Sequence, residues 1–323
     1  MYTVKTYNSS LKSQWDQFVS AAKNATFLLE RDFMDYHSDR FEDLSLLVYK
    51  ESSLVAVLPA NKKGNTVHSH QGLTYGGLVL GKKTKLNEII FIFKSVLSFL
   101  SKDGIETLHL KLTPSIYHKV PSDEMEYLLF ISEATLTRVD VSSVIENASK
   151  LKIQSNRMEG VKKAKKNTLE IIEGTDFKSF WTEILEPNLE QRHGAIPVHS
   201  LEEIERLARC FSKNILQFNV YKEGVIVAGA TIFETDNVAH VQYISADEEK
   251  QRLGSLDFLF EYLINQRFKD KKYFDFGISN ENQGKNLNKG LLYWKETFGA
   301  RSIACKFYSI ATADHTKLDS VLL

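Results

Sequence analysis

The chain has 323 residues, of which 43% are hydrophobic and 25% charged, and its formal net charge is zero. This composition is typical of a globular protein of two ordinary domains, and it gives no overall field that would attract DNA or an anionic membrane. The two cysteines, Cys210 and Cys305, exclude a disulfide framework and have no metal-type spacing, which fits a reducing compartment. The N-terminus lacks the features of a signal peptide, and the apolar stretch Ile89–Leu100 is too short to span a membrane. We therefore predict a cytoplasmic protein without a membrane span.

The first half of the chain predicts a mixture of strands and helices. Apolar or alternating runs predict strands, and apolar residues at helical spacing predict helices. The expected strands are 2–7, 45–50, 53–60, 107–112 and 134–141, and the expected helices are 11–22, 31–40 and 88–102. The glycine-containing segment His68–Leu78 is expected to be a substrate-facing loop with His70 and Tyr75 as contacts. A tight turn with structural glycines is the alternative.

A basic segment follows at residues 146–168. It carries seven cationic side chains: Lys150, Lys152, Arg157, Lys162, Lys163, Lys165 and Lys166. We expect a helical connector whose charges are solvated. A face that binds phosphate or RNA is the alternative, because a chain without net charge can still concentrate positive potential locally.

The second half predicts the element order β-α-α-β-β-β-α-β-α-β. It starts with a strand at Leu169–Gly174 and a helix at Asp176–Arg192, which Pro187 should kink or split. Ser200 and Glu203 form a capping-box pattern for the next helix. The remaining strands are expected at 215–222, 225–234, 238–245, 273–278 and 302–310, with helices at 255–268 and 287–298. The first half shows a loose version of this order without a residue-level repeat.

This order, with a strand, a loop and a helix after the third hairpin strand, resembles the GNAT acyltransferase fold. Two such units in tandem, closed by "GLLYWKETFGA" (residues 290–300), resemble the FemABX aminoacyltransferases and their GNAT-type relatives. The resemblance is carried by Tyr273–Gly277, Gly284–Ala300, Glu190–Leu207 and Thr26–Phe41. It implies an α/β (α+β) fold of two tandem GNAT-like domains, each a mixed, mostly antiparallel sheet flanked by helices. The expected parts are a domain at 1–145, the connector at 146–168, a donor-binding domain at 169–310 and a tail at 311–323.

Lys295 stands beside an apolar stripe formed by Leu287, Leu291, Trp294 and Phe298. Spacing alone allows either a lysine that extends to solvent or one whose charge enters a site. The resemblance implies that Lys295 stabilises the transition state, with Trp294 as its aromatic neighbour. It also implies substrate contacts from Arg192 and, in the N-terminal segment, from His37, which replaces the family's lysine, or from Arg40.

Two further residues are candidates for acid–base chemistry. Asp275 lies between Phe274 and Phe276, which point to the other face of the strand, so its carboxylate could accept a proton in a cleft. Capping of a turn is the alternative role for Asp275. His240 is expected to share a strand face with Gln242, which suggests a polar cleft, although a buried core histidine is the commoner arrangement. His193 lies in an expected loop and is a candidate substrate contact.

The segment "QRLGSL" (residues 251–256) partly matches the GNAT turn that binds a donor's pyrophosphate through backbone N–H groups. Gln251 and Gly254 match, and Leu256 does not. The expected donor contacts are Tyr243, Gln251, Arg252, Gly254 and Ser255. The alternative is that Ser255 only caps a helix.

The predicted function is an N-acyltransferase that uses acetyl-CoA or another acyl-CoA and no metal. By resemblance, its acceptor is the amine of a cell-envelope precursor, such as an amino sugar, a nucleotide sugar or a peptide. One alternative is transfer from aminoacyl-tRNA, with the basic segment in contact with the RNA. Another is a GNAT-fold protein that binds a ligand without catalysis. The sequence gives no oligomeric state.

Overall fold

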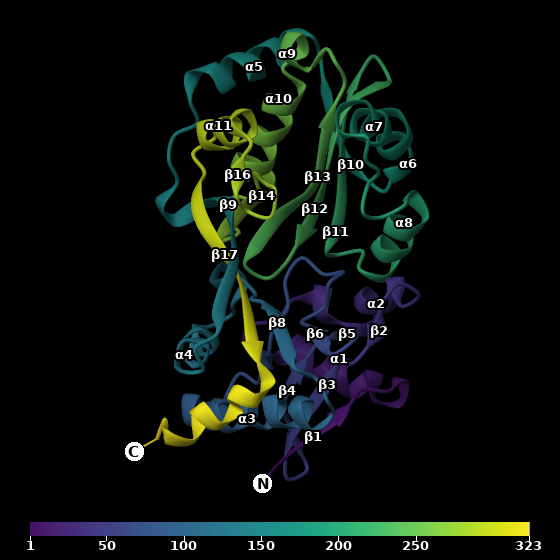
Figure 1. Ribbon diagram of the computed structural model, residues 1–323. Helices are drawn as coiled ribbons and strands as arrows, with labels where there is room; N and C mark the ends of the chain where they lie inside the picture. Colours follow the sequence, from purple (N-terminus) through teal and green to yellow (C-terminus); the bar gives the residue numbers. More distant parts are fainter. Residues whose placement is uncertain (323) are drawn as a thin grey trace. The chain divides into compact units, whose positions relative to one another are not determined.

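The computed structural model describes residues 1–322, except for the side chains of Arg192 and His193, and it divides into two compact units (Figure 1). The first unit comprises Met1–Asp140 and Ala304–Leu323, and the second comprises Val141–Ile303. Two long strands, β9 (Thr135–Glu146) and β17 (Arg301–Ala311), contribute residues to both units. The basic segment expected as a connector therefore lies within the second unit, and the C-terminal strand lies mostly in the first.

The first unit contains two sheets. One has the antiparallel order β1 (Tyr2–Thr6), β3 (Leu46–Lys50), β4 (Ser53–Leu58) and β7 (Val79–Leu80). The other places β17 beside β8 (Thr107–Lys111), followed by β6 (Thr66–His68), β5 (Asn61–Lys63) and β2 (Glu42–Asp43). β6 and β8 run parallel, and their last pair is His68 with His109. The short strands β2, β5, β6 and β7 were not predicted, because runs of two or three residues carry no period.

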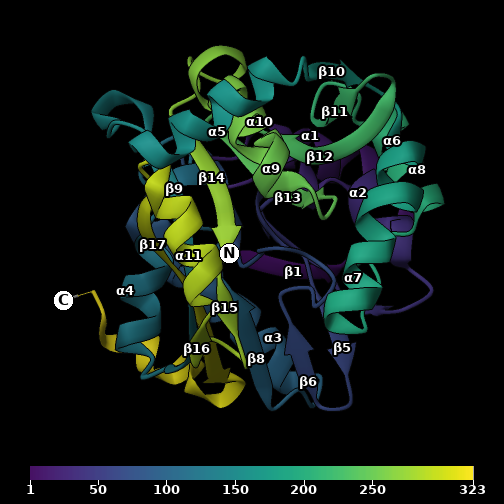
Figure 2. The ribbon, with the colours of Figure 1, turned by 90° about the horizontal axis from the view of Figure 1, so that it is seen from above.

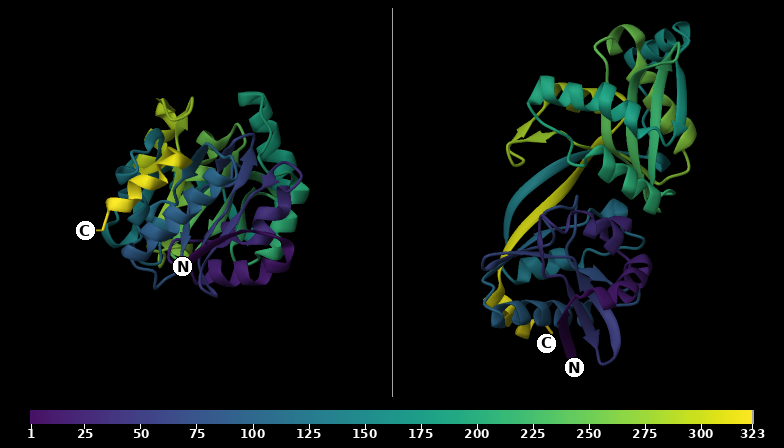
Figure 3. Two further views of the ribbon diagram at one scale, coloured as in Figure 1. Left: turned by 60° about the horizontal axis from the view of Figure 1, so that its bottom comes forward. Right: turned by 90° about the vertical axis from the view of Figure 1, so that its right-hand side faces the viewer.

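Helix α3 (Leu86–Lys102) contributes seven buried side chains to the first unit's core. Among them, Ile89, Phe93, Val96 and Leu100 recur at helical spacing and belong to the same core cluster as the β8 residues Leu108 and Leu110. The C-terminal 3-10 helix, Thr312–Ser320, runs beside α3 (Figure 3). The remaining helices of this unit are α1 (Lys12–Ala21), α2 (Arg31–Met34) and α4 (Glu124–Ile131).

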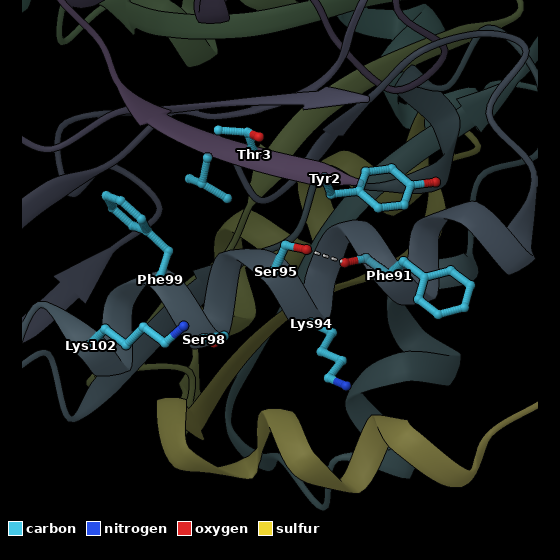
Figure 4. Close-up of a pocket in the computed structure, with 9 residues that line it drawn as sticks. Tyr2, Thr3, Phe91, Lys94, Ser95, Ser98, Phe99 and Lys102 are labelled. Atoms are coloured by element: carbon cyan, nitrogen blue, oxygen red, sulfur yellow. Dashed lines mark hydrogen bonds between the residues drawn. The ribbon is translucent and has the colours of Figure 1, made fainter. Parts of the chain in front are cut away.

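A groove of about 450 Å³ lies between β1 and α3 in the first unit (Figure 4). The Tyr2 and Phe91 rings are stacked with their centroids 6.2 Å apart, and Lys94 and Lys102 are the charged residues of the lining. This groove contains no histidine or carboxylate in its lining, so it offers no base for proton transfer.

The sheet of the second unit is antiparallel except at one pair of strands. Its order is β10 (Glu170–Gly174), β11 (Ile215–Lys222), β12 (Val225–Glu234), β13 (Val238–Ala246), β14 (Tyr273–Ile278) and then β9. β13 and β14 run parallel, with His240 opposite Asp275 in their last pair. Each unit therefore contains a parallel pair of strands among mostly antiparallel ones.

Helices cover both faces of this sheet (Figure 2). On one face lie α5 (Ser155–Lys166), α9 (Lys250–Leu253), α10 (Ser255–Tyr262) and α11 (Lys289–Thr297), which bury a core around Phe260, Phe274 and Phe298. On the other lie α6 (Phe177–Ser179), the π-helix Phe180–Leu185, α7 (Glu186–His193) and α8 (Leu201–Cys210). The predicted capping box of α8 is present, and the predicted break near Pro187 takes the form of the π-helix that precedes α7.

The predicted fold class is confirmed. Both units combine mostly antiparallel strands, one parallel pair and flanking helices, because each apolar strand face needs a helical layer to exclude water.

Candidate active site

The second unit brings a histidine, an aspartate and a lysine together where β13 and β14 separate. The parallel pairing ends at His240 and Asp275, and the pairing of β14 with β9 shifts register between Asp275 and Ile278. Gly277 has φ +75°, a conformation that a residue with a side chain rarely adopts. A Cβ on Gly277 would lie 3.4 Å from His240 Cε1, so the bulge brings the backbone close to the imidazole.

Asp275 is held by donors from three strands. Its carboxylate accepts hydrogen bonds from Ser142 Oγ on β9, from Gly277 N at 2.8 Å and from His240 Nδ1 at 2.9 Å. The side chain is buried, and both carboxylate oxygens are engaged. This geometry favours Asp275 as the group that orients His240 over the sequence-based interpretation of Asp275 as the base itself.

His240 has the arrangement expected of a general base. Nδ1 faces Asp275, which fixes the ring orientation, and Nε2 makes no hydrogen bond within the described residues. The side chain is 14% exposed, so the ring is reachable from solvent. The predicted pairing of His240 with Gln242 on one face is altered, because β13 bulges between Val241 and Tyr243 where it pairs with β12.

Lys295 turns into the unit and not out to solvent. α11 is capped by Asn288, and its Trp294 and Phe298 pack against Phe260 and Phe276. Lys295 is 3% exposed, and its Nζ donates to the carbonyl oxygens of Gly277 at 2.9 Å and Ile278 at 2.7 Å. Burial lowers the pKa of Lys295 to about 8, and the charge of Asp275 partly opposes this shift. The bulge of β14 thus joins Lys295 to the strand that carries Asp275.

The apolar stripe beside Lys295, defined above from the sequence, is only half buried. Trp294 and Phe298 pack into the core, whereas Leu287 and Leu291 are exposed. Trp294 is therefore a packing neighbour of Phe260, and a role in substrate contact stays a prediction.

Tyr243, a predicted donor contact, has its hydroxyl engaged. It bonds His199 Nδ1 at 2.6 Å and accepts from His199 N at 3.1 Å, and its ring packs edge-on against Trp181. Burial raises the pKa of Tyr243 to about 12, so the phenol is neutral at physiological pH.

The predicted contacts of the first unit are mostly buried. The His37 and His70 rings stack with centroids 5.1 Å apart, and burial lowers the pKa of His70 to about 3. Tyr75 is buried with its hydroxyl 2.8 Å from Thr26 Oγ1, whereas Arg40 is exposed. Arg192 and His193 lie in α7, but their side chains are outside the described residues, so they stay predictions.

No family model and no curated relative matches the chain. Among solved structures, it is similar to FemX, with a TM-score of 0.68 at 10% identity over 98% of this chain and 99% of that one. It is also similar to the C-terminal domain of a putative lysylphosphatidylglycerol synthetase from Agrobacterium fabrum (TM-score 0.59, 11% identity, 95% and 94% covered). A tandem GNAT protein from the clavulanic acid biosynthesis pathway matches with a TM-score of 0.50 (10% identity, 97% and 99% covered). The chain has a FemABX-like, tandem GNAT-type fold.

Within this fold, the turn expected to hold a pyrophosphate is covered. Gly254 and Ser255 are buried, and the N–H groups of Leu253 and Gly254 already donate to Glu249 O and Lys250 O, at 2.9 and 2.8 Å. A Cβ on Gly254 would lie 2.1 Å from the carbonyl oxygen of Gly160 in α5, so the two backbones touch. This arrangement does not favour a pyrophosphate on the turn. Of the other predicted donor contacts here, Gln251 is exposed and Arg252 is ion-paired with Glu249.

Gly254 should tolerate no side chain. We expect Gly254→Ala to lower the free energy of unfolding by about 2 kcal/mol or more, because the alanine combines an unfavourable φ with a backbone clash. Gly174→Ala is the matched control, since no atom lies within 4 Å of its Cβ. Urea unfolding of both variants measures the difference, and equal stabilities would show that α5 is not seated on this turn.

The basic segment forms an exposed cationic face on α5. Lys162, Lys163, Lys165 and Lys166 are exposed and form no ion pair within the described residues, whereas Arg157 pairs with Asp257 at 2.9 Å. We call these four residues the α5 lysine face. Of the predicted uses of the segment, a role as a linker between domains does not fit, because α5 packs on α10 within the second unit.

The described residues contain no group of three or more metal-ligating side chains, and none of their helices is long and apolar enough to cross a bilayer.

Proposed function

We propose that this chain is an acyltransferase that joins an activated acyl group to an amine. The observation that carries the proposal is the meeting of His240, Asp275 and Lys295 at the place where β13 and β14 separate. A base with a fixed orientation and a buried ammonium supply what amide formation needs, namely a neutral amine and charge stabilisation for the oxyanion.

The reaction would proceed in two steps. His240 Nε2 takes a proton from the amine as its nitrogen attacks the acyl carbonyl, and Asp275 stabilises the imidazolium that forms. The oxyanion of the tetrahedral intermediate is stabilised by the Lys295 ammonium, which has a third N–H beside the two bound to backbone carbonyls. The intermediate then collapses, its bond to the leaving group breaks, and the imidazolium returns the proton to that group.

We propose aminoacyl-tRNA as the donor, in place of the acyl-CoA that the sequence predicted. The covered turn at Gly254 argues against a bound pyrophosphate, and the α5 lysine face offers uncompensated positive charge to an RNA backbone. The acceptor we propose is the amine of a cell-envelope precursor, such as an amino sugar, a nucleotide sugar or a peptide. The folds of FemX and of the lysylphosphatidylglycerol synthetase domain support a cell-envelope acceptor by analogy.

A binding experiment separates the two donors. Alanyl-tRNA should bind with a steep dependence on salt, because lysine–phosphate contacts release counterions. Replacing the α5 lysine face by four glutamines should make this salt slope shallower, whereas Lys82→Gln with Lys83→Gln, at two exposed sites in the first unit, should leave it unchanged. A flat salt response together with stabilisation by acetyl-CoA would overturn the tRNA proposal and favour acyl-CoA.

Turnover tests the reaction itself. The enzyme should transfer radiolabelled alanine from tRNA to at least one amine in a set that includes glucosamine, its UDP-linked form and a lysine-containing peptide. Binding of a donor without transfer to any acceptor would favour the alternative of a binding protein.

A further inference from the structure

Lys111 occupies an unusual place in the first unit. It lies on β8, where Leu108 and Leu110 point into the apolar core, so Thr107, His109 and Lys111 point to the opposite face of the sheet. Phe307 on β17 is directly opposite Lys111 in the register. The Lys111 side chain is half-buried although it carries a charge.

Within the part of the chain that the structure describes, the charge of Lys111 has no carboxylate partner. Its Nζ donates to the carbonyl oxygen of Leu73, and no ion pair within 4.0 Å reaches it from the described residues. Asp140, whose charge acts on Lys111, is engaged by Arg138, which binds both carboxylate oxygens at 2.9 and 2.6 Å. Asp140 is therefore already engaged by Arg138, and at Lys111 the repulsion by Arg138 is larger than the attraction by Asp140.

The Lys111 and Arg138 cations both lie over the ring of Phe307. The Lys111 Nζ lies 5.7 Å and the Arg138 guanidinium carbon 4.7 Å from the centre of its ring. Desolvation lowers the pKa of Lys111 to about 8, and repulsion by Arg138 adds to this shift. The other titratable groups whose charges couple to Lys111 are Asp140, Cys305 and His70. An anion between the two cations would relieve this repulsion.

The loop that covers Lys111 is fixed on β8. Ser69 donates its N–H to His109 O at 2.8 Å, and its hydroxyl accepts from Lys111 N at 2.8 Å. Gly76 N donates to Lys111 O at 2.7 Å, and Thr113 Oγ1 donates to Gly76 O at 2.9 Å. Because both ends of the loop are tied to the strand, the carbonyl of Leu73 and the ammonium it holds are preorganised. The loop expected to face substrate therefore serves to position Lys111.

We propose that Lys111, beside Arg138 and Phe307, binds a phosphate-like oxyanion of a ligand. Lys111 has donors left for such a group, since one carbonyl satisfies only one of its three N–H bonds. Arg138 supplies further positive potential, and the Phe307 ring shields one side of both cations from water. This site lies in the first unit and is independent of the reaction proposed for the second.

Titration calorimetry with inorganic phosphate and with sulfate tests the site. At about pH 7 and low ionic strength, Lys111→Met should weaken binding of both anions by about tenfold or more, because a charge-assisted hydrogen bond is lost. Lys306→Met is the matched control, since this neighbouring β17 lysine pairs with Glu126. Lys111→Arg should retain part of the affinity. Equal binding by wild type and Lys111→Met, or no binding by wild type, would overturn the proposal.

Two further measurements, a comparison of anions and a pH series, define which kind of anion binds and which group binds it. Acetate should bind more weakly than sulfate, and equal affinity would replace the phosphate-like ligand by a carboxylate. Sulfate keeps its charge across the neutral range, so its affinity should fall as pH rises through about 8, where Lys111 loses its proton. The fall should persist in Cys305→Ala, and a profile that is flat in the wild type would contradict the role of Lys111. Circular dichroism of each variant checks that the fold is kept.

Discussion

Replacing Lys295 by methionine is expected to lower kcat by about 10²–10³-fold, because loss of one oxyanion donor from a water-excluded site typically costs that much. Methionine keeps an unbranched chain of similar length at this buried position, so the apolar contacts of α11 should survive. The change should leave the KM for the donor nearly unaltered, since the proposed role is confined to the transition state. Steady-state transfer of labelled alanine measures both constants.

Lys289→Met is the matched control for this prediction. Lys289 stands on the same helix but is exposed, so its loss should leave kcat unchanged. If Lys295→Met retained full turnover at normal thermal stability, Lys295 would be a structural residue that only ties α11 to the bulge of β14.

Replacing His240 by glutamine is expected to lower kcat by about 10²–10⁴-fold, the usual range for loss of a general base. Asp275→Asn should have a comparable effect through a different cause. An asparagine amide can donate to Nδ1, which would leave the proton on Nε2 and remove the basic nitrogen from the side that faces the substrate. Both variants are measured in the same transfer assay.

His68→Gln provides the matched control for His240→Gln. His68 ends the parallel pair of the first unit as His240 does in the second, but it faces His109 instead of a carboxylate. It should change kcat by less than about threefold, because His68 lies in the first unit, whereas the residues proposed to act in the reaction lie in the second. If His240→Gln behaved like His68→Gln, the base would have to be a different group.

The fold was largely predictable because its longest elements carry clear periods. The buried positions of α3 recur at helical spacing, β8 alternates, and Ser200 with Glu203 marks the start of α8. Elements of two or three residues, such as β2 and β7, depend on neighbours distant in sequence and carry no such signal.

The site was predictable only in part. A family resemblance predicts Lys295 as a site residue, and the strand pattern predicts His240 and Asp275. Nothing in the sequence pairs Asp275 with Ser142, which is 133 positions away. The contact of Gly160 with Gly254 has no local signal either, because it arises when α5 packs on α10. Because of that contact, the turn is covered in the fold although its sequence resembles an open pyrophosphate-binding turn. The structure therefore favours a different donor from the one that the sequence predicts.

The dependence of kcat on pH tests the central claim most directly, namely that the Lys295 ammonium stabilises the transition state. The buried lysine has a pKa of about 8, so it carries its charge below that pH and loses it above. Wild-type kcat should therefore fall as pH rises through about 8, whereas Lys295→Met should be slower at every pH and should lack this fall. A fall near pH 8 that persists in Lys295→Met would contradict the account, because a different group would then be titrating.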